Sequence, residues 1–369
     1  MKVGIDTFGL DHGQSGLGSY LYYLMSNLPY EEDMTYELFG EESDRYTYKA
    51  KFDTQYAPVE ISEKLNVQRS WHIFKLNKFS RQRKYDVVLY SAATRMIPSK
   101  FSVKGIAIVN DVLSFLLAGT HHKYLKTIGL HGLKKADAII VPSEYVKNDL
   151  ISFGLAKDKI KVIPNGIDHS IFYPQNLSEG EYVDIKPFAI KRPYLIYPSK
   201  ISHEAKKHIQ LIKAFNVFKE KTKLPHRLVL AGSQDDYADE VQKYVLDSPY
   251  ASDIFMTGFF PHKELGLLYS NADACIFPSS QEGVGLSILE TMACGIPVAC
   301  ADSAALPEVS GGNAVLFNPD DINQMAQSIE KVVCDKELRE HLVTGALEWT
   351  KKFTWANTAS KLVEVIKSL

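Results

Sequence analysis

Short hydrophobic runs rich in β-branched residues alternate with amphipathic stretches along most of the 369-residue chain. In the first half these runs lie at residues 2–8, 85–91, 104–111, 136–143 and 158–165. A second series lies at residues 193–199, 226–233, 254–260, 272–279 and 296–303. Buried strands that alternate with helical segments are typical of βα units on a parallel sheet, so the pattern predicts an α/β protein.

The alternation pauses between the two series. Over residues 171–192, Pro, Gly and charged residues interrupt the periodicity, as is typical of a segment that joins two domains. We therefore predict an N-terminal Rossmann-like domain over 1–170, a linker over 171–192 and a C-terminal Rossmann-like domain over 193–350. A chain of this length is long enough to bury two separate cores.

The last segment, residues 351–369, carries apolar residues at helical spacing, namely Ala356, Ala359, Leu362 and Val363. This spacing predicts an amphipathic helix with one apolar stripe. Such a stripe needs a surface to cover, and we expect the helix to cross back to the N-terminal domain.

The overall charge gives no reason to expect nucleic-acid binding, because the formal net charge is −2 and any basic surface must be local. Residues 1–10 predict a strand rather than a signal peptide, and no apolar run reaches the length of about 18 residues that a membrane span needs. We expect a cytoplasmic protein without a membrane span. Cys275, Cys294, Cys300 and Cys334 form no C-x-x-C pair, which favours buried free thiols over a disulfide framework or a zinc site.

Two glycine-rich turns precede helical segments. In the first, Gly16 and Gly18 follow the opening strand, but the third glycine of a dinucleotide-binding fingerprint would fall at Leu21. No acidic residue follows a clear second strand, so the pattern disfavours an NAD site. An ordinary left-handed turn is the simpler interpretation, although the start of the helix still offers N–H groups to an anion.

The second turn contains Glu282, Gly283 and Gly285 and leads into a predicted helix over 286–294, which Gly295 ends. Glu290 lies eight residues after Glu282, and this separation corresponds to at most about 12 Å along a helix. That distance suits two carboxylates that hold the two ends of a nucleotide sugar, with the diphosphate at the glycine turn. The alternative is that Glu282 is an ordinary charge at the start of a helix and Glu290 a solvated side chain.

Residues 282–290, "EGVGLSILE", resemble the E-x7-E signature of the retaining glycosyltransferases of family 4, which have the GT-B fold. Residues 195–215 are similar to the donor-diphosphate segment of that family, and residues 162–174 to its interdomain "NGVD" passage. The resemblance covers essentially the whole chain. It implies an α/β protein of GT-B fold, with two Rossmann-like domains whose parallel sheets face a central cleft.

The resemblance also implies roles for individual residues. Glu290 would bind the ribose hydroxyls, Glu282 the sugar hydroxyls, and Lys200 with Lys206 the pyrophosphate. The backbone of Gly283, Val284, Gly285 and Leu286 would cradle the sugar and phosphate, Gly258 and Phe259 would lie near the base, and Gly16 and Gly18 would face the cleft. Two cations and a helix N-terminus neutralise a departing diphosphate without a metal, and the chain carries no D-x-D motif. We therefore expect no metal and no cofactor besides the nucleotide-sugar donor.

Three departures from the family pattern concern the chemistry. Asn110 and Asp111 stand where many members have His-Asp, and Asn cannot act as an acid or base near neutral pH. We expect Asn110 to position a substrate, in a front-side mechanism in which the leaving phosphate deprotonates the acceptor. Lys200 replaces an Arg and loses its bidentate geometry. Val284 and Ser287 replace the usual Phe and Pro, which shifts the expected sugar specificity.

Residues 69–85 interleave basic and aromatic side chains, namely Arg69, Lys75, Lys78, Arg81, Arg83, Lys84, Trp71, Phe74 and Phe79. This combination suits an anionic membrane surface, with a nucleic-acid patch and a solvated helix as alternatives. Because family members act on lipid-linked saccharides, we favour weak contact with the inner face of the cytoplasmic membrane and no nucleic acid.

The resemblance is strongest to bacterial mannosyltransferases of surface-polysaccharide pathways. It implies a transferase that moves mannose from GDP-mannose to a growing, lipid-linked glycan such as a lipopolysaccharide. The alternatives are a nucleotide-sugar-binding module that has lost transfer, which Asn110 favours, and a nucleotide-sugar epimerase of the same fold. An NAD oxidoreductase ranks last.

Overall fold

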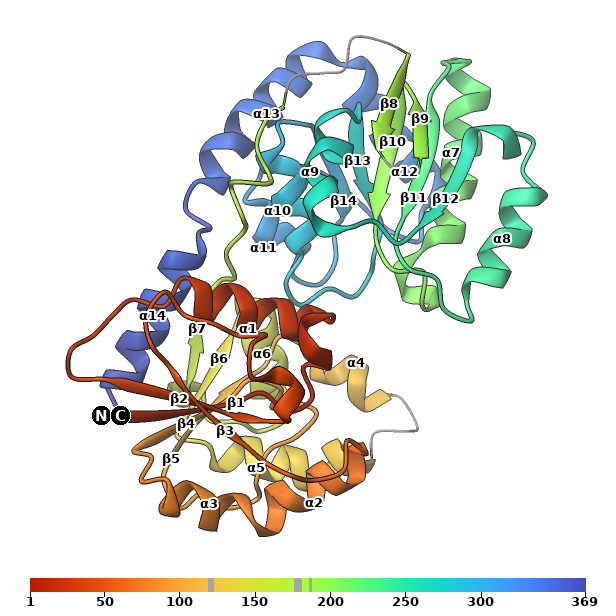
Figure 1. Cartoon of the computed structure of the whole chain (residues 1–369). Helices are drawn as coiled ribbons and strands as arrows, with labels where there is room; N and C mark the ends of the chain where they lie inside the picture. The colour runs from red at the N-terminus through yellow and green to blue at the C-terminus, as the bar shows by residue number, and fades with distance from the viewer. Residues whose placement is uncertain (119–122, 176–180, 186–187) are drawn as a thin grey trace. The chain divides into compact units, whose positions relative to one another are not determined.

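A computed structural model describes residues 1–118, 123–175, 181–185 and 188–369 (Figure 1). The chain divides into two compact units. The first unit comprises Met1–Gly166 together with Phe353–Leu369, and the second comprises Ile167–Lys352. The stretch predicted as a linker, 171–192, therefore belongs to the second unit, where part of it forms an antiparallel strand pair.

The first unit is built on a parallel sheet of seven strands in the order β3-β2-β1-β4-β5-β6-β7. The strands are β1 (Lys2–Asp6), β2 (Thr35–Gly40), β3 (Gln55–Pro58), β4 (Val87–Tyr90), β5 (Lys104–Ile108), β6 (Ala138–Val141) and β7 (Ile160–Val162). Their residues alternate between two apolar clusters, as the period of a strand requires. Along β4, Val87 and Leu89 join one cluster while Val88 and Tyr90 join the other.

Helices cover both faces of this sheet, since each cluster also contains helical residues. They are α1 (Gly16–Ser26), α2 (Leu65–Phe74), α3 (Leu76–Gln82), α4 (Leu113–Ala118), α5 (Leu130–Lys135), α6 (Glu144–Ser152) and α14 (Trp355–Lys367). Short 3-10 segments, η1 (Asp11–Gly13), η2 (Glu42–Asp44) and η4 (Lys157–Lys159), and a π-helical segment, η3 (Leu125–Gly129), complete the unit.

The terminal helix α14 packs beside α1, and the two chain ends lie close together (Figure 1). Trp355 stacks on Tyr23 with ring centroids 5.3 Å apart and meets the edge of Tyr20 at 5.6 Å. The apolar stripe of α14 contains Ala359, Leu362 and Val363, as the sequence predicts. Ala356 is exposed, because Trp355 and Ile366 fill the stripe instead.

The second unit has a parallel sheet of six strands in the order β12-β11-β10-β13-β14-β15 and a separate antiparallel pair. The parallel strands are β10 (Tyr194–Pro198), β11 (Arg227–Ala231), β12 (Ile254–Gly258), β13 (Ala274–Phe277), β14 (Val298–Ala301) and β15 (Val315–Phe317). The antiparallel pair joins β8 (Tyr182–Ile185) to β9 (Phe188–Lys191).

The helices of the second unit connect these strands. They are α7 (His208–Thr222), α8 (Ala238–Leu246), α9 (His262–Ser270), α10 (Leu286–Ala293), α11 (Leu306–Ser310), α12 (Ile322–Cys334) and α13 (Lys336–Thr350), with short 3-10 segments η5 (Glu204–Lys206) and η6 (Ala251–Asp253). Cys275, Cys294 and Cys300 are buried free thiols, as predicted. Cys334, at the end of α12, is exposed, so the prediction of burial is wrong for this one thiol.

The prediction of two Rossmann-like domains with parallel sheets is confirmed. In both units the strand order reverses beside the first strand of the sheet, between β1 and β4 and between β10 and β13. In open α/β sheets, ligands bind outside the carboxyl ends of the strands at such switch points. The topology thus predicts one position in each unit where polar side chains are best placed to bind a ligand.

Candidate functional site

The switch point of the second unit is formed by the loops that follow β10 and β13. The loop after β13 is fixed to the loop after β10, because the backbone N–H and the hydroxyl of Ser280 both donate to the carbonyl of Ala205, at 2.9 and 3.1 Å. Tyr197, on β10, donates from its hydroxyl to the carbonyl of Lys206 at 2.8 Å. These bonds hold both loops in place without using the functional groups of Lys206 or Glu282.

Lys206 and Glu282 meet at this point. The ammonium Nζ of Lys206 lies 2.5 Å from Oε1 of Glu282, and only 18% and 17% of the two side chains are exposed. The carbonyl of Glu282 accepts a bond from the backbone N–H of Ala305 at 3.1 Å, which fixes the backbone of the glycine turn. Two residues that the sequence assigns to one site, although 76 positions apart, are therefore in direct contact.

Lys200 has a different partner. Its Nζ lies 2.8 Å from Oδ2 of Asp235, which follows β11, and about half of each side chain is exposed. Lys200 follows β10 directly and so lies at the same end of the sheet as Lys206. Its predicted role as a diphosphate ligand stays a prediction.

The glycine turn leads into α10 as the sequence predicts. Gly285 has a φ of +65°, a left-handed conformation that disfavours residues with a side chain. A Cβ atom there would also lie 3.3 Å from side-chain atoms of Leu306 and Val309. The first N–H groups of α10 have no carbonyl partner within the helix, and together with the helix dipole they favour an anion at this end. Val284 and Leu286 lie within this turn and at the start of α10.

Glu290 lies on the inner side of α10 and is buried, which excludes the alternative of a solvated side chain. Its Oε1 lies 3.8 Å from Nε2 of His262, the first residue of α9, and this carboxylate raises the pKa of His262. The ring of His262 packs edge-on against Phe172 at 5.2 Å. Sequence reasoning missed His262, because no spacing rule links the start of α9 to the middle of α10.

Gly258 and Phe259 are predicted to lie near a base. Gly258 ends the edge strand β12, which is two strands away from β10, and Phe259 follows it. Gly258 has a φ of +74°, and the side chain of Phe259 is 73% exposed. An exposed aromatic face at this end of the sheet suits stacking on a flat ring, and the assignment remains a prediction.

In the first unit, Gly16 and Gly18 begin α1. Ser15 caps the helix by accepting a bond from the N–H of Gly18 at 3.2 Å. A Cβ atom on Gly18 would lie 2.4 Å from the carbonyl oxygen of Leu10, so the close approach of two backbone segments requires glycine there. The left-handed backbone lies just before this turn, at Gly9, Asp11, His12 and Gly13.

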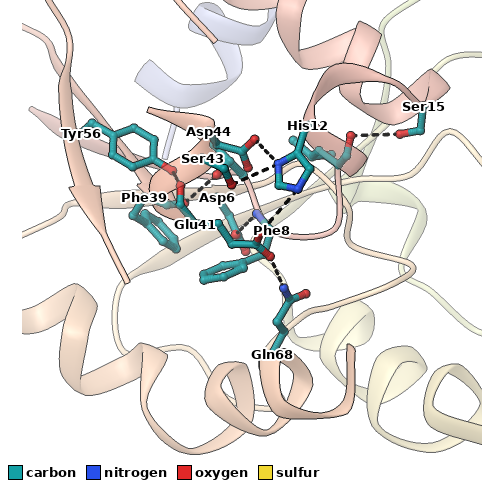
Figure 2. Close-up of polar contacts among 12 residues, drawn as sticks. Asp6, Phe8, His12, Ser15, Phe39, Glu41, Ser43, Asp44, Tyr56 and Gln68 are labelled. Carbon is teal, nitrogen blue, oxygen red and sulfur yellow. Dashed lines mark hydrogen bonds and ion pairs between the residues drawn. The ribbon is translucent and has the colours of Figure 1, made fainter. Parts of the chain in front are cut away.

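A polar network braces the segment before α1 (Figure 2). Nδ1 of His12 lies 2.8 Å from Oδ1 of Asp44, and its Nε2 lies 3.6 Å from Oε2 of Glu41. Gln68, on α2, donates to the other carboxylate oxygen of Glu41, and the hydroxyl of Tyr56 donates to the carbonyl of the same residue. The hydrogen bond to Asp44 raises the pKa of His12, while burial raises the pKa of Asp44. The sequence did not predict this network, because it did not predict β2, the strand that carries Glu41 and Asp44 to this edge.

Asn110 and Asp111 follow β5, the neighbour of β4 at the first switch point. The carboxylate of Asp111 accepts a bond from the hydroxyl of Thr94 at 2.6 Å. Thr94 follows β4, so Asp111 ties together the loops after two neighbouring strands. Both residues lie at the carboxyl edge of the sheet, where the sequence predicts a site.

Models of two known protein families match successive parts of the chain. The family model for "Glycosyltransferase Family 4" matches residues 15–171, and that for "Glycosyl transferases group 1" matches residues 180–349. The chain is a family 4 glycosyltransferase. Each model falls almost entirely within one of the two sheet-bearing parts of the chain.

Among curated proteins, the glycosyltransferase is 26% identical over 293 residues to "O-antigen chain mannosyltransferase B" of Escherichia coli, covering 78% of this chain and 76% of that protein. It is 27% identical over 235 residues to "Sulfoquinovosyl transferase SQD2" of Arabidopsis thaliana, with 62% and 44% covered. It is 28% identical over 244 residues to "Serotype-specific mannosyltransferase WbdA" of Escherichia coli, with 63% and 29% covered. The chain thus spans less than half of the last two relatives.

Solved structures confirm the GT-B fold. Sucrose-phosphate synthase from Thermosynechococcus elongatus superimposes with a TM-score of 0.73 at 19% identity, covering 100% of this chain and 98% of that one. Anabaena Alr3699/HepE in complex with UDP and glucose superimposes with a TM-score of 0.73 at 17% identity, covering 100% of both chains. At these identities the likeness establishes the fold alone.

The basic and aromatic segment of the glycosyltransferase, residues 69–85, presents fewer of its residues to solvent than the sequence predicts. Trp71 and Phe79 pack on Phe39, with ring centroids 6.3 and 5.3 Å away, and are partly buried against the core. Arg83 is exposed, but its guanidinium pairs with the buried carboxylate of Glu37. Apart from Arg83, the exposed basic and aromatic members are Phe74, Lys75, Lys78, Arg81 and Lys84, which we call the α2–α3 patch.

The described residues of the glycosyltransferase contain neither a candidate membrane span nor a candidate metal site. Among them no helix has the length and apolar character of a membrane span. Within the same residues, no group of three or more His, Cys, Asp or Glu side chains is arranged to hold a metal ion.

Proposed function

We propose that this glycosyltransferase is a retaining enzyme that transfers mannose from GDP-mannose to a growing, lipid-linked glycan. The contact between Lys206 and Glu282 beside the start of α10 carries this proposal. It joins a cation suited to a diphosphate and a carboxylate suited to sugar hydroxyls at a topological switch point. The names of two relatives, both mannosyltransferases, support the choice of sugar.

Glu290 would hold the other end of the donor. Its carboxylate is buried and lies on α10, the helix that follows the glycine turn. It can therefore accept bonds from ribose hydroxyls while α10 directs N–H groups at the phosphates. The ammonium groups of Lys206 and Lys200 would balance the charge that develops on the leaving diphosphate.

The transfer step follows from these roles. The bond between the anomeric carbon and the phosphate oxygen breaks, and the acceptor hydroxyl oxygen bonds to that carbon from the same face. The leaving phosphate oxygen takes the proton of the hydroxyl, so no side-chain base is required. Asn110 would orient the sugar or acceptor by hydrogen bonds, since its amide both donates and accepts.

The first test combines binding and transfer. We expect GDP to stabilise the protein against heat more than UDP, ADP or NAD does, to the same extent with magnesium or with a chelator. Glu290→Ala should lower the rate of transfer to a lipid-linked acceptor by about 100-fold or more, because hydrogen bonds to a charged group contribute about 1.5–3 kcal/mol each.

The matched control is Glu240→Ala, which removes an exposed carboxylate on α8 and should leave transfer unchanged. Full activity of the Glu290 variant would contradict the assignment. Nucleotide binding without transfer to any acceptor would support the alternative of a binding module.

We also propose that the α2–α3 patch makes weak contact with an anionic membrane. Phe74, the last residue of α2, is 75% exposed. Lys75, Lys78, Arg81 and Lys84 follow it in sequence, and residues 69–85 contain no carboxylate. An exposed aromatic ring flanked by basic side chains suits the interface of anionic lipids.

Sedimentation with vesicles tests this contact. Phe74→Ser combined with Lys78→Glu should reduce binding to vesicles of phosphatidylglycerol and phosphatidylcholine by about tenfold, since each basic residue contributes about 1 kcal/mol. Tyr46→Ser, which removes another exposed aromatic ring of the first unit, is the control and should bind as the wild type does. Equal binding by all three proteins would refute membrane contact through this patch.

A further inference from the structure

In this structure the lysine assigned to the diphosphate is paired with the carboxylate assigned to the sugar. Nζ of Lys206 and Oε1 of Glu282 are 2.5 Å apart, and more than four fifths of each side chain is shielded from solvent. A shielded ion pair retains more of its attraction than one in water does, because water screens the exposed pair. The pair between Lys200 and Asp235, about half exposed, is the natural comparison.

A diphosphate must therefore compete with Glu282 for Lys206. The backbones of both residues are fixed, since the carbonyl of Lys206 accepts a bond from Tyr197 and that of Glu282 accepts one from Ala305. Lys206 can therefore exchange Glu282 for a phosphate only through movement of the two side chains. With the carboxylate in place, a phosphate that approaches Lys206 also meets a negative charge.

The donor and the product differ in what they offer Glu282. An intact sugar nucleotide brings hydroxyl groups, which donate hydrogen bonds to a carboxylate. The free nucleoside diphosphate lacks the transferred sugar and so has none of its hydroxyl groups to donate to the Glu282 carboxylate. Among the residues that the structure describes, Lys206 is the ion-pair partner of the Glu282 carboxylate. The phosphate of the product repels the same carboxylate.

We propose that Glu282 discriminates between the intact donor and the free nucleoside diphosphate. It rests on Lys206 in the empty enzyme and turns to the sugar hydroxyls when the donor binds. After transfer it returns to Lys206, which weakens the hold on the diphosphate and speeds product release. This inference rests on the proposed function of the same site.

The test measures the dissociation constants of GDP and GDP-mannose, and of UDP and UDP-glucose, by calorimetry. Glu282→Gln keeps the shape of the side chain and removes its charge. We expect it to bind the free diphosphate about tenfold more tightly than the wild type, because breaking the ion pair no longer opposes binding. The donor should bind no more tightly, so the preference for donor over product falls by about tenfold.

Two further variants complete the design. Asp235→Asn neutralises the partner of Lys200, and since that pair is half exposed it should change diphosphate binding by less than about threefold. Glu282→Ala, judged by its own thermal unfolding, replaces the Gln variant if that variant is destabilised. In the double variant Glu282→Gln with Lys206→Met, the tightening should disappear.

The outcomes separate the two claims. Wild-type protein that binds neither GDP nor UDP would overturn the proposed function and this inference with it. If the wild type binds the diphosphate and both Glu282 variants bind it no more tightly than the wild type does, the inference alone is overturned. Equal tightening by Asp235→Asn would also overturn it, because the effect would then follow net charge rather than the pair.

Discussion

At the scale of single residues, burial distinguishes side chains that the sequence treats alike. His208, the first residue of α7, is fully buried beside Tyr197, with ring centroids 4.7 Å apart. Burial, reinforced by the positive charge of Lys206, lowers the pKa of His208 from 6.5 to about 3. The folded protein therefore keeps this ring neutral across the physiological range.

This histidine should make the protein sensitive to acid. Below pH 6.5 the unfolded chain binds a proton at His208 that the folded chain does not bind. The contribution of neutral His208 to the free energy of unfolding is therefore fully present above pH 6.5 and is lost as the pH decreases towards 3. At pH 5 the loss attributable to His208 is about 2 kcal/mol. Urea unfolding at pH 7.5 and pH 5 should show that His208→Leu loses about 2 kcal/mol less than the wild type. His341→Leu, which removes an exposed histidine of α13, should lose as much as the wild type; if both variants behave alike, His208 is not the source.

Much of the candidate site was readable from residue spacing. The separation of Glu282 and Glu290, the glycine turn and the helix stop at Gly295 all describe local backbone, which follows from nearby residues. The partners of these residues were not readable. Lys206 with Glu282 is a contact across 76 positions, and His262 reaches Glu290 from another helix. Such contacts depend on the order of strands in the sheet, which one sequence does not state.

At the scale of elements, α14 contributes to the stability of the first unit more than its position at the chain end suggests. Trp355 is 5% exposed and contacts two tyrosines of α1. Gly166 lies against its backbone, where a Cβ atom would come within 2.2 Å of the Trp355 nitrogen. The hydroxyl of Thr358 donates to the carbonyl of Pro164 at 2.8 Å.

Trp355→Ala should therefore destabilise the first unit by about 3–5 kcal/mol, the usual cost of removing a large aromatic side chain from a core. Hydrogen exchange followed by mass spectrometry is the measurement, and faster exchange is expected in peptides from α1 and β1. Trp349→Ala is the matched control, since Trp349 lies in the second unit and donates to the carbonyl of Val309. If Trp355→Ala speeds exchange equally in both units, the two cores are not independent.

The shortest strands that the sequence missed share a physical cause, which does not apply to the longer and largely buried β2. Central strands such as β4 and β10 are buried on both faces and stand out as continuous apolar runs. The strands β3, β15, β8 and β9 are three or four residues long, and β8 alternates exposed and buried positions. Asp184 on β8 and Lys191 on β9 contribute charges to residues 171–192, which therefore have the composition of a linker.

At the scale of the whole molecule, the chain contains the same type of unit twice, a parallel sheet with a reversal of strand order. Each unit places a strand-order reversal beside its first strand, and each gathers charged side chains at the loops that follow. The repeat was predictable, because two series of buried strands describe two parallel sheets. The bounds of the first unit were harder to predict than the repeat. The first unit ends at Gly166 rather than 170 and resumes at Phe353 rather than 351.

The return of the chain to its first unit sets an order on the production of the protein. The contact between Lys367 and Glu31 joins residues 336 positions apart, so a ribosome needs roughly 20 to 70 s between making one partner and the other. During that interval the apolar side of α1 is not covered by α14, because every residue of the second unit emerges before α14 does. The nascent protein should thus complete its second half first, and until the last helix leaves the ribosome its earliest part is the one in need of a chaperone.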